Sequence, residues 1–182
     1  MTEIRIHGRG GQGAVIAAQM LAKALFKEGQ YVQAFPAFGM ERRGAPVASF
    51  VRFDKRPVRI RCEIYEPDHI IVLDPTLIAA ANITAGLKRK GWILVNSDRR
   101  DRLGLPSQFR VAVVDASSIA VKNKLGTAAI PIVNTAILGA FARATGLVGL
   151  EAVLAAIQES VPVRPRENAH AARQAYDFAE TL

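Results

Sequence analysis

The sequence contains very little cysteine. Cys62 is the only one in 182 residues, so no disulfide can form within the chain, and we expect Cys62 to be a small strand residue. A structural zinc site or an iron–sulfur cluster held by this chain alone is not expected, because both take several thiolates. His69 and His170 have no partner at metal-ligand spacing, and no residue has the context of a covalent nucleophile. We therefore expect neither a catalytic residue nor a metal site.

Aromatic residues and long apolar runs are also scarce. Aromatics make up 7% of the chain and do not alternate with basic residues, so the net charge of +8 points to a solvated surface or a protein interface. We expect no nucleic-acid partner. No apolar run reaches the roughly 18 residues that cross a membrane, and Met1 leads directly into a strand without signal-peptide features. We expect a cytoplasmic protein with no membrane partner.

Strand-like and helix-like segments alternate along the chain. Apolar runs such as 69–73 are typical of strands buried on both faces of a parallel sheet. Segments 47–53 and 58–64, joined by Asp54–Pro57, predict an antiparallel hairpin. The pattern predicts an α/β fold: a Rossmann-like open, mostly parallel sheet with helices on both faces and an inserted antiparallel hairpin, in one domain over residues 1–182. The other expected strands are 3–7, 31–35, 92–95 and 111–114, and the expected helices are 14–28, 134–145, 150–160 and 167–182, with short ones after Pro75 and Asp115.

The turn between the first strand and the first helix is rich in glycine. Residues 8–13 read Gly-Arg-Gly-Gly-Gln-Gly and fit the pattern G-x-G-x-x-G. Backbone N–H groups at the start of a helix bind anions, so the candidate anion-binding residues are Arg9, Gly10, Gly11, Gln12 and Gly13. The alternative is that the glycines only permit a tight turn and close packing of helix on strand.

Two common nucleotide sites are not favoured at this turn. A dinucleotide site requires an acidic residue at the end of the second strand, but that strand ends Gln33-Ala34-Phe35-Pro36. The phosphate-loop pattern G-x-x-x-x-G-K-[ST] is absent. NAD and ATP are therefore not the expected ligands.

A second charged turn follows one strand later. Glu41, Arg42 and Arg43 lie between Gly39 and Gly44, and arginine recognises carboxylates and phosphates through two parallel hydrogen bonds. The alternative is an ordinary solvated loop. Its place after the second strand brings it to the same sheet edge as the glycine turn, which favours a functional role.

Polar residues that end the apolar strands are weaker candidates. Asp74 and Asp115 follow buried strands and could face a ligand, but helix capping is the more common role for both. His7 ends the first strand beside the glycine turn, where a hydrogen bond to backbone is the more common arrangement.

Several segments together resemble the gamma subunit of 2-oxoacid:ferredoxin oxidoreductases. The resemblance covers essentially the whole chain in order, and the Glu-Arg-Arg-Gly-Ala-Pro segment most resembles the pyruvate branch. The segments are GRGGQG (8–13), GMERRGAPV (39–47), YEPD (65–68), LDPTL (73–77), NTAILGA (134–140) and ENA (167–169).

The resemblance implies a subunit that is inactive alone. Pyruvate, coenzyme A and oxidised ferredoxin would give acetyl-CoA, carbon dioxide and reduced ferredoxin in an enzyme with alpha, beta and delta subunits. Thiamine diphosphate, Mg and [4Fe-4S] clusters would be held by those partners. By carry-over, Arg9 and residues 10–13 would contact a coenzyme A phosphate or a partner subunit. Glu41, Arg42 and Arg43 would face the active-site entrance or the subunit interface.

Three alternatives are compatible with the sequence. The chain could be a gamma-type subunit for another 2-oxoacid (branched-chain, 2-oxoglutarate or indolepyruvate). It could be a free-standing nucleotide-binding Rossmann-like domain, which NAD or NADP binding would reveal. It could also be an interaction module whose glycine turn binds nothing.

Overall fold

The fold is built on one seven-stranded mixed sheet. The computed structural model describes residues 1–37, 43–99 and 101–182, and the strand order within them is β2-β3-β1-β4-β5-β6-β7. The pairs β1–β4, β4–β5 and β5–β6 are parallel, whereas β3 runs antiparallel to both of its neighbours and β7 is antiparallel to β6. All described strands except β3 and β7 therefore run in one direction. The strands are β1 (Thr2–Arg9), β2 (Tyr31–Pro36), β3 (Pro46–Asp54), β4 (His69–Val72), β5 (Trp92–Asn96), β6 (Arg110–Val114) and β7 (Glu180–Thr181).

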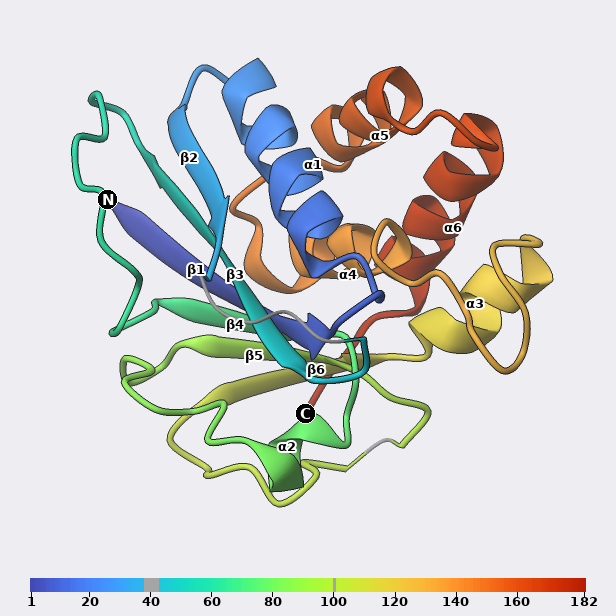
Figure 1. Ribbon diagram of the computed structural model, residues 1–182, viewed down its shortest axis with the longest axis horizontal. Helices are drawn as coiled ribbons and strands as arrows, with labels where there is room; N and C mark the ends of the chain where they lie inside the picture. Colours follow the sequence, from blue (N-terminus) through green and yellow to red (C-terminus); the bar gives the residue numbers. More distant parts are fainter. Residues whose placement is uncertain (38–42, 100) are drawn as a thin grey trace.

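Helices cover the two faces of the sheet unequally. Of the described helices, five lie on one face and only the short α2 lies on the other, where loops complete the cover (Figure 1). Alternation within the strands matches this arrangement. Ile4 and Ile6 pack under the helices, and Ile70 and Val72 pack on the opposite face. The helices are α1 (Ala14–Lys27), α2 (Leu77–Ala80), α3 (Ala116–Lys122), α4 (Ala136–Thr145), α5 (Leu150–Ser160) and α6 (Pro165–Phe178).

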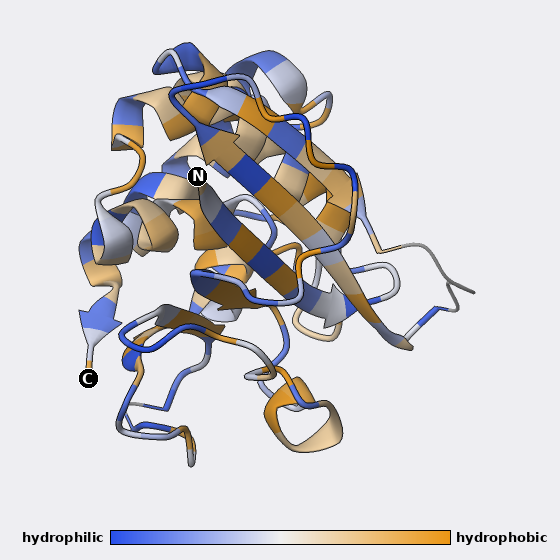
Figure 2. Ribbon diagram, turned by 90° about the vertical axis from the view of Figure 1, so that its left-hand side faces the viewer, coloured by the Kyte–Doolittle hydropathy of each residue, from blue (hydrophilic) through white to orange (hydrophobic). Residues whose placement is uncertain are grey.

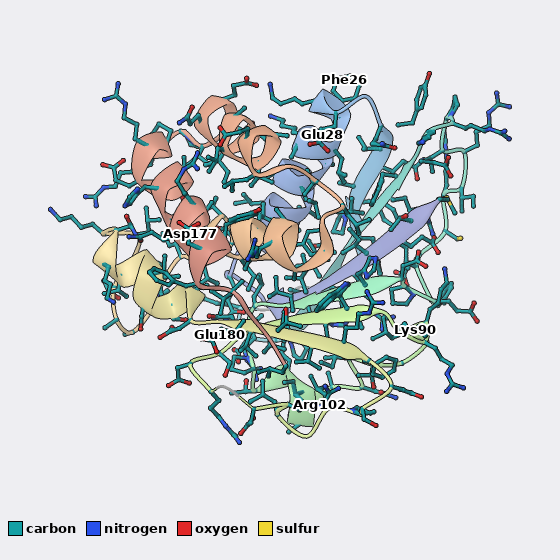
Figure 3. All side chains as sticks on the ribbon, turned by 180° about the vertical axis from the view of Figure 1, so that it is seen from behind. Phe26, Glu28, Lys90, Arg102, Asp177 and Glu180 are labelled. Atoms are coloured by element: carbon teal, nitrogen blue, oxygen red, sulfur yellow. The ribbon has the colours of Figure 1, made fainter. Side chains whose placement is uncertain are left out.

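The ends of α1 explain its position. Gly29, with φ 81°, follows the helix, and the Glu28 carboxylate accepts from the N–H of Gly149 at 2.7 Å. This bond ties the end of α1 to the start of α5. Figure 3 labels Glu28 at the end of α1. The same geometry leaves the other end of α1, at Gly13, pointing toward the carboxyl end of β1.

The predicted α/β class and mostly parallel sheet are confirmed. The prediction that residues 58–64 form the second strand of a hairpin was wrong. Residues 57–61 have no regular structure, and β3 pairs instead with β2 and β1. Cys62 is correspondingly exposed and outside any strand. Figure 2 shows the alternating bands of β1, which begins at the label N. The last helix was also predicted too long, because it ends at Phe178 and the chain then forms β7.

No described helix is long and apolar enough to cross a bilayer.

Candidate functional site

The glycine turn joins β1 to α1 in a left-handed backbone conformation. Gly11 has φ 96° and Gly13 has φ 79°, values that side-chain-bearing residues rarely adopt. Gly13 is the N-cap of α1 and provides no side-chain cap. Among the described residues, the N–H groups of Gly11, Gly13 and Ala14 have no hydrogen-bond acceptor. The turn therefore presents free donors at the positive end of a helix of 14 residues.

Asp74 holds the turn in place. Its Oδ2 accepts from Arg9 Nε at 2.9 Å and from Gln12 Nε2 at 3.2 Å. Arg9 also donates to the Gly44 carbonyl at 3.1 Å and to the Thr76 hydroxyl at 2.7 Å. The Gln12 carbonyl oxygen accepts from the Arg9 N–H at 2.7 Å. The side chains of Arg9 and Gln12 are thus engaged in shaping the turn.

The predicted capping role of Asp74 was wrong. Thr76 is the N-cap of α2, and Asp74 Oδ1 instead accepts from the Thr76 N–H at 3.0 Å, which closes a local turn before the helix. Burial opposes ionisation of Asp74, but hydrogen bonds from Thr76, Gln12 and Arg9 outweigh it and hold the pKa of this carboxyl below its ordinary value. Asp74 is therefore a carboxylate at neutral pH.

The second charged turn adjoins the first. Gly10 bridges to Arg43, the Gly10 N–H donates to the Ala45 carbonyl at 2.9 Å, and the Gly44 N–H donates to the Gly10 carbonyl at 3.0 Å. The expected proximity of the two turns is confirmed for Arg43, which is exposed. Glu41 and Arg42 lie outside the described residues.

A cleft of about 620 Å³ opens over the turn. Small-molecule sites fall in the range of roughly 300 to 1,000 Å³. Beside it lies a second hollow of about 450 Å³, which shares Ile16, Ile132 and Asn134 with the first. The two hollows are therefore direct neighbours. The lining of the cleft comprises residues 9–13, 43–44, 73–75 and 129–134 with Ile16, Asn96 and Ser117.

Asn134 stands at the junction of the two hollows. Its side chain is 5% exposed, and its Oδ1 is buried without a hydrogen-bond partner among the described residues. A methyl group at Gly13 would lie 2.4 Å from Asn134 Nδ2, so a side chain at this position would have to displace the amide. A buried amide oxygen without a partner is costly, which marks Asn134 as a candidate ligand contact.

Two further polar residues were not identified from the sequence. Asn96 Nδ2 donates to the Leu73 carbonyl at 2.9 Å and to the Ser117 hydroxyl at 3.0 Å. Asn96 and Ser117 both line the cleft. Asn96 ends β5, and ligands of parallel sheets bind at such strand ends. That rule was a usable signal for Asn96, whereas the sequence signal at Asn134 was its place at the start of the NTAILGA segment (134–140).

The remaining polar strand ends behave as structural groups. Asp115 caps α3 by accepting from the Ser118 N–H at 2.8 Å, which confirms the predicted role. His7 Nε2 accepts from Arg5 Nε at 3.0 Å rather than bonding to backbone. Burial, followed by the charge of Arg5, lowers the pKa of His7 to about 4.

The segments 134–140 and 167–169 meet in the structure. The Thr135 hydroxyl donates to Asn168 Oδ1 at 2.7 Å, and both side chains are buried. Asn168 Nδ2 in turn donates to the carbonyls of Val163 and Arg164. These bonds fix the start of α4, and with it Asn134, against α6.

Comparison with known proteins identifies the family. Residues 3–178 match the family described as pyruvate ferredoxin/flavodoxin oxidoreductase. The chain belongs to this family. The "Pyruvate/ketoisovalerate oxidoreductases common subunit gamma" of Pyrococcus furiosus is 51% identical over 187 residues, which cover 100% of this chain and 99% of the relative. The "Pyruvate synthase subunit PorC" of Methanocaldococcus jannaschii is 49% identical, with 97% and 96% covered.

A solved structure of the family has the same fold. The crystal structure of pyruvate oxidoreductase subunit PORC from Thermotoga maritima superposes with a TM-score of 0.82 at 37% identity. The match covers 99% of this chain and 97% of that one. The family resemblance recognised in the sequence is therefore confirmed over nearly the whole length of this chain.

Proposed function

We propose that this chain is the gamma subunit of a 2-oxoacid:ferredoxin oxidoreductase. The complete enzyme would convert pyruvate, coenzyme A and oxidised ferredoxin into acetyl-CoA, carbon dioxide and reduced ferredoxin in the cytoplasm. The observation that carries the assignment is the family match over residues 3–178, together with relatives named as gamma or PorC subunits at about 50% identity over nearly their full length. Alpha, beta and delta subunits are the proposed partners.

The 2-oxoacid is proposed to be pyruvate, and a branched-chain 2-oxoacid is the alternative. Both relatives carry pyruvate in their names, and the gamma subunit of Pyrococcus furiosus is named as common to pyruvate and ketoisovalerate oxidoreductases. A subunit shared by two enzymes cannot by itself select between their substrates. We therefore assign the choice of 2-oxoacid to the partner subunits.

We infer that the cleft over the glycine turn receives coenzyme A. Free N–H groups of Gly11, Gly13 and Ala14 would donate to a phosphate, and the exposed Arg43 would add a positive charge. Arg9 and Gln12 would keep the turn in this shape through Asp74. The adjoining hollow, reached past Asn134, offers room for an elongated molecule. The alternative use of the same residues is contact with a partner subunit.

The redox cofactors are assigned to the partners. The described residues contain no group of three or more His, Cys, Asp or Glu side chains placed to hold a metal ion, and the chain has one cysteine. These residues do not fit a [4Fe-4S] cluster, which takes four thiolates. We propose that the partner subunits also bind thiamine diphosphate and its Mg ion. The role of this chain is then assembly of the complex and positioning of coenzyme A.

The decisive experiment is recovery of the tagged chain from its native cells. The eluate should contain further subunits and should reduce ferredoxin or a viologen dye only when both pyruvate and coenzyme A are present. A chain that elutes alone would contradict the proposal. Tight binding of NAD or NADP by that isolated chain would then identify a free-standing nucleotide-binding domain. If the chain co-purifies with partner subunits but its glycine turn does not bind coenzyme A, it is an interaction module.

A further inference from the structure

The chain between β3 and β4 forms a separate surface. Residues 55–66 lie outside the sheet, beside the N-terminus at the amino ends of the parallel strands (Figure 1). The Asp68 N–H donates to the Glu3 carbonyl at 2.8 Å, which fixes the end of this stretch to the start of β1. The glycine turn follows the other end of β1, so the two surfaces lie at opposite ends of the strands.

Two buried arginines hold this stretch without a strand ladder. Arg52 donates to the Cys62 carbonyl at 2.7 Å and to the Glu63 carbonyl at 3.1 Å, and Arg5 donates to the Ile64 carbonyl at 3.5 Å. Three consecutive carbonyls are thus bonded to guanidinium groups. Arg52 is 1% exposed and pairs with Glu3 at 2.6 Å. The stretch is therefore ordered before any partner arrives, which lowers the entropy cost of binding.

The ordered stretch displays interface-type side chains. Tyr65 is 69% exposed and Ile60 is 43% exposed, and Ile60 lies between the exposed Arg59 and Arg61. Tyrosine and arginine are enriched among residues that carry binding energy in protein interfaces. We refer to residues 55–66 as the basic segment.

Positive charge at this edge exceeds what the neighbouring acids neutralise. Of the acids, Asp54 pairs with the amino terminus and Asp68 pairs with Lys88 at 2.8 Å. Glu63 and Glu66 remain. Among the described residues, the exposed cations of the edge without an ion pair or side-chain hydrogen bond are Lys55, Arg56, Arg59, Arg61, Arg89 and Lys90. Figure 3 shows Lys90 at this end of the molecule.

We propose that the basic segment docks onto an acidic surface of a companion subunit. The inference rests on the proposed function, which supplies the companion subunits. Charge complementarity selects an acidic partner, and the exposed Ile60 and Tyr65 between the cations favour a protein with apolar contacts over a polyanion. A single-stranded nucleic acid, which could also meet exposed tyrosines and cations, is the alternative that the experiment below separates from a protein partner.

The test is reconstitution of the tagged full chain with the other subunits of its own oxidoreductase. Association would be measured at ionic strengths from about 50 to about 500 mM, a range over which exposed charges are increasingly screened. The test variant is Arg59→Glu/Arg61→Glu. The matched control is Lys122→Glu/Arg166→Glu, which makes the same charge change at exposed residues on α3 and α6. A third variant, Tyr65→Ala, removes apolar contact without changing charge.

The expected result is an affinity lower by about tenfold or more for Arg59→Glu/Arg61→Glu, with a weaker dependence on salt. Tyr65→Ala should also weaken association, and the control pair should stay within about twofold of the parent chain. Circular dichroism should show every variant folded, because Arg59, Arg61 and Tyr65 are exposed.

Unchanged association of both test variants would overturn the docking surface and leave the proposed function intact. Loss of binding to a single-stranded RNA oligonucleotide, with assembly unchanged, would also overturn it and assign the segment to nucleic acid. If the unmodified chain associates with none of the companion subunits, the proposed function itself fails, and this inference fails with it.

Discussion

Arg9 and Asp74 form the ion pair that joins the glycine turn to the end of β4, with Arg9 Nε 2.9 Å from Asp74 Oδ2. The two residues lie 65 positions apart in the sequence. The pair is only partly buried, with side-chain exposures of 29% and 16%. Its main effect is geometric, because the same carboxylate also receives Gln12 and Thr76. The shape of the candidate site therefore depends on one aspartate outside the glycine motif.

Replacing Asp74 tests this dependence. Asp74→Ala removes the acceptor of three side chains and should cost about 1 to 2 kcal/mol of unfolding free energy, since the groups left unpaired keep access to solvent. Coenzyme A affinity should fall because the turn loses its anchor. Urea denaturation and calorimetric titration would measure the two effects. The control is Asp98→Ala, at an exposed aspartate in the loop after β5. It should change neither the unfolding free energy nor the coenzyme A affinity, and losses equal to those of Asp74→Ala would contradict the role of Asp74.

Alanine at Gly13 and at Gly11 should have different effects. Both glycines have positive φ, so alanine at either position costs about 1 to 2 kcal/mol of backbone strain. A methyl group at Gly11 meets nothing within 4 Å, whereas at Gly13 it lies 2.4 Å from Asn134 Nδ2. We expect Gly13→Ala to destabilise the chain more than Gly11→Ala and to weaken coenzyme A binding further. Equal unfolding free energies for the two variants would show that Asn134 moves aside freely.

Gly13→Asp should impair the site in a second way. It adds a negative charge at the positive end of α1, where the phosphate is proposed to bind. Coenzyme A-dependent turnover of the assembled enzyme should fall further than for Gly13→Ala. Full turnover with an unchanged coenzyme A requirement in a folded, assembled Gly13→Asp enzyme would rule out the ligand role of the turn.

His7 should make stability depend on pH. Burial and the Arg5 charge lower the pKa of His7 to about 4 in the folded chain, whereas an unfolded histidine titrates near about 6.5. Between these values the unfolded state takes up a proton that the folded state does not. Stability is therefore complete above about pH 6.5 and is lost as the pH falls toward about 4, by about 2 to 3 kcal/mol.

The measurement compares urea unfolding from pH 7.5 down to about pH 4 for the parent chain and for His7→Gln. The parent should lose more stability than His7→Gln over this window, because glutamine can accept from Arg5 without titrating. His170→Gln, at an exposed histidine on α6, is the control and should follow the parent curve. A parent curve that runs parallel to that of His7→Gln would mean that His7 has the same pKa in the folded and unfolded chain, and burial would then not lower it.

The fold was predictable where local pattern and tertiary packing agree. The apolar run 69–73 became a parallel strand with both faces covered, and Asp115 became a helix cap. The error at 58–64 has a physical cause. Arg59-Ile60-Arg61-Cys62 alternates like a strand, but the carbonyls of residues 62 to 64 are bonded by Arg52 and Arg5. Long-range guanidinium bonds of this kind leave no local periodic signal.

The candidate site was predictable in its location but not in its internal connections. The spacing of glycines identified the turn, and the chain order placed Arg43 beside it. The roles of Asp74 and Asn134 depend on contacts between segments more than 60 residues apart. No single-sequence rule distinguishes an aspartate that caps the next helix from one that holds a distant arginine. The unpaired oxygen of Asn134 is a property of the packed structure alone.

The packing of α4 on α6 permits a stringent last test. A methyl group at Gly139 would lie 1.7 Å from the Ala172 carbonyl oxygen, so α6 must move for any side chain to fit. In an unobstructed helix interior, Gly→Ala stabilises by about 0.8 to 1 kcal/mol. Here we expect Gly139→Ala to destabilise the chain by about 3 kcal/mol or more, as overpacking against rigid backbone does.

Gly104→Ala provides the comparison for Gly139→Ala, because a methyl group at Gly104 meets nothing within 4 Å and only its positive φ of 74° opposes alanine. That variant should lose about 1 to 2 kcal/mol. Since α6 also positions Thr135 through Asn168, Gly139→Ala should displace Asn134 and weaken coenzyme A binding as well. An unfolding free energy at or above that of the parent chain would show that α4 and α6 separate at little cost, and the fixed placement of Asn134 would then have to be abandoned.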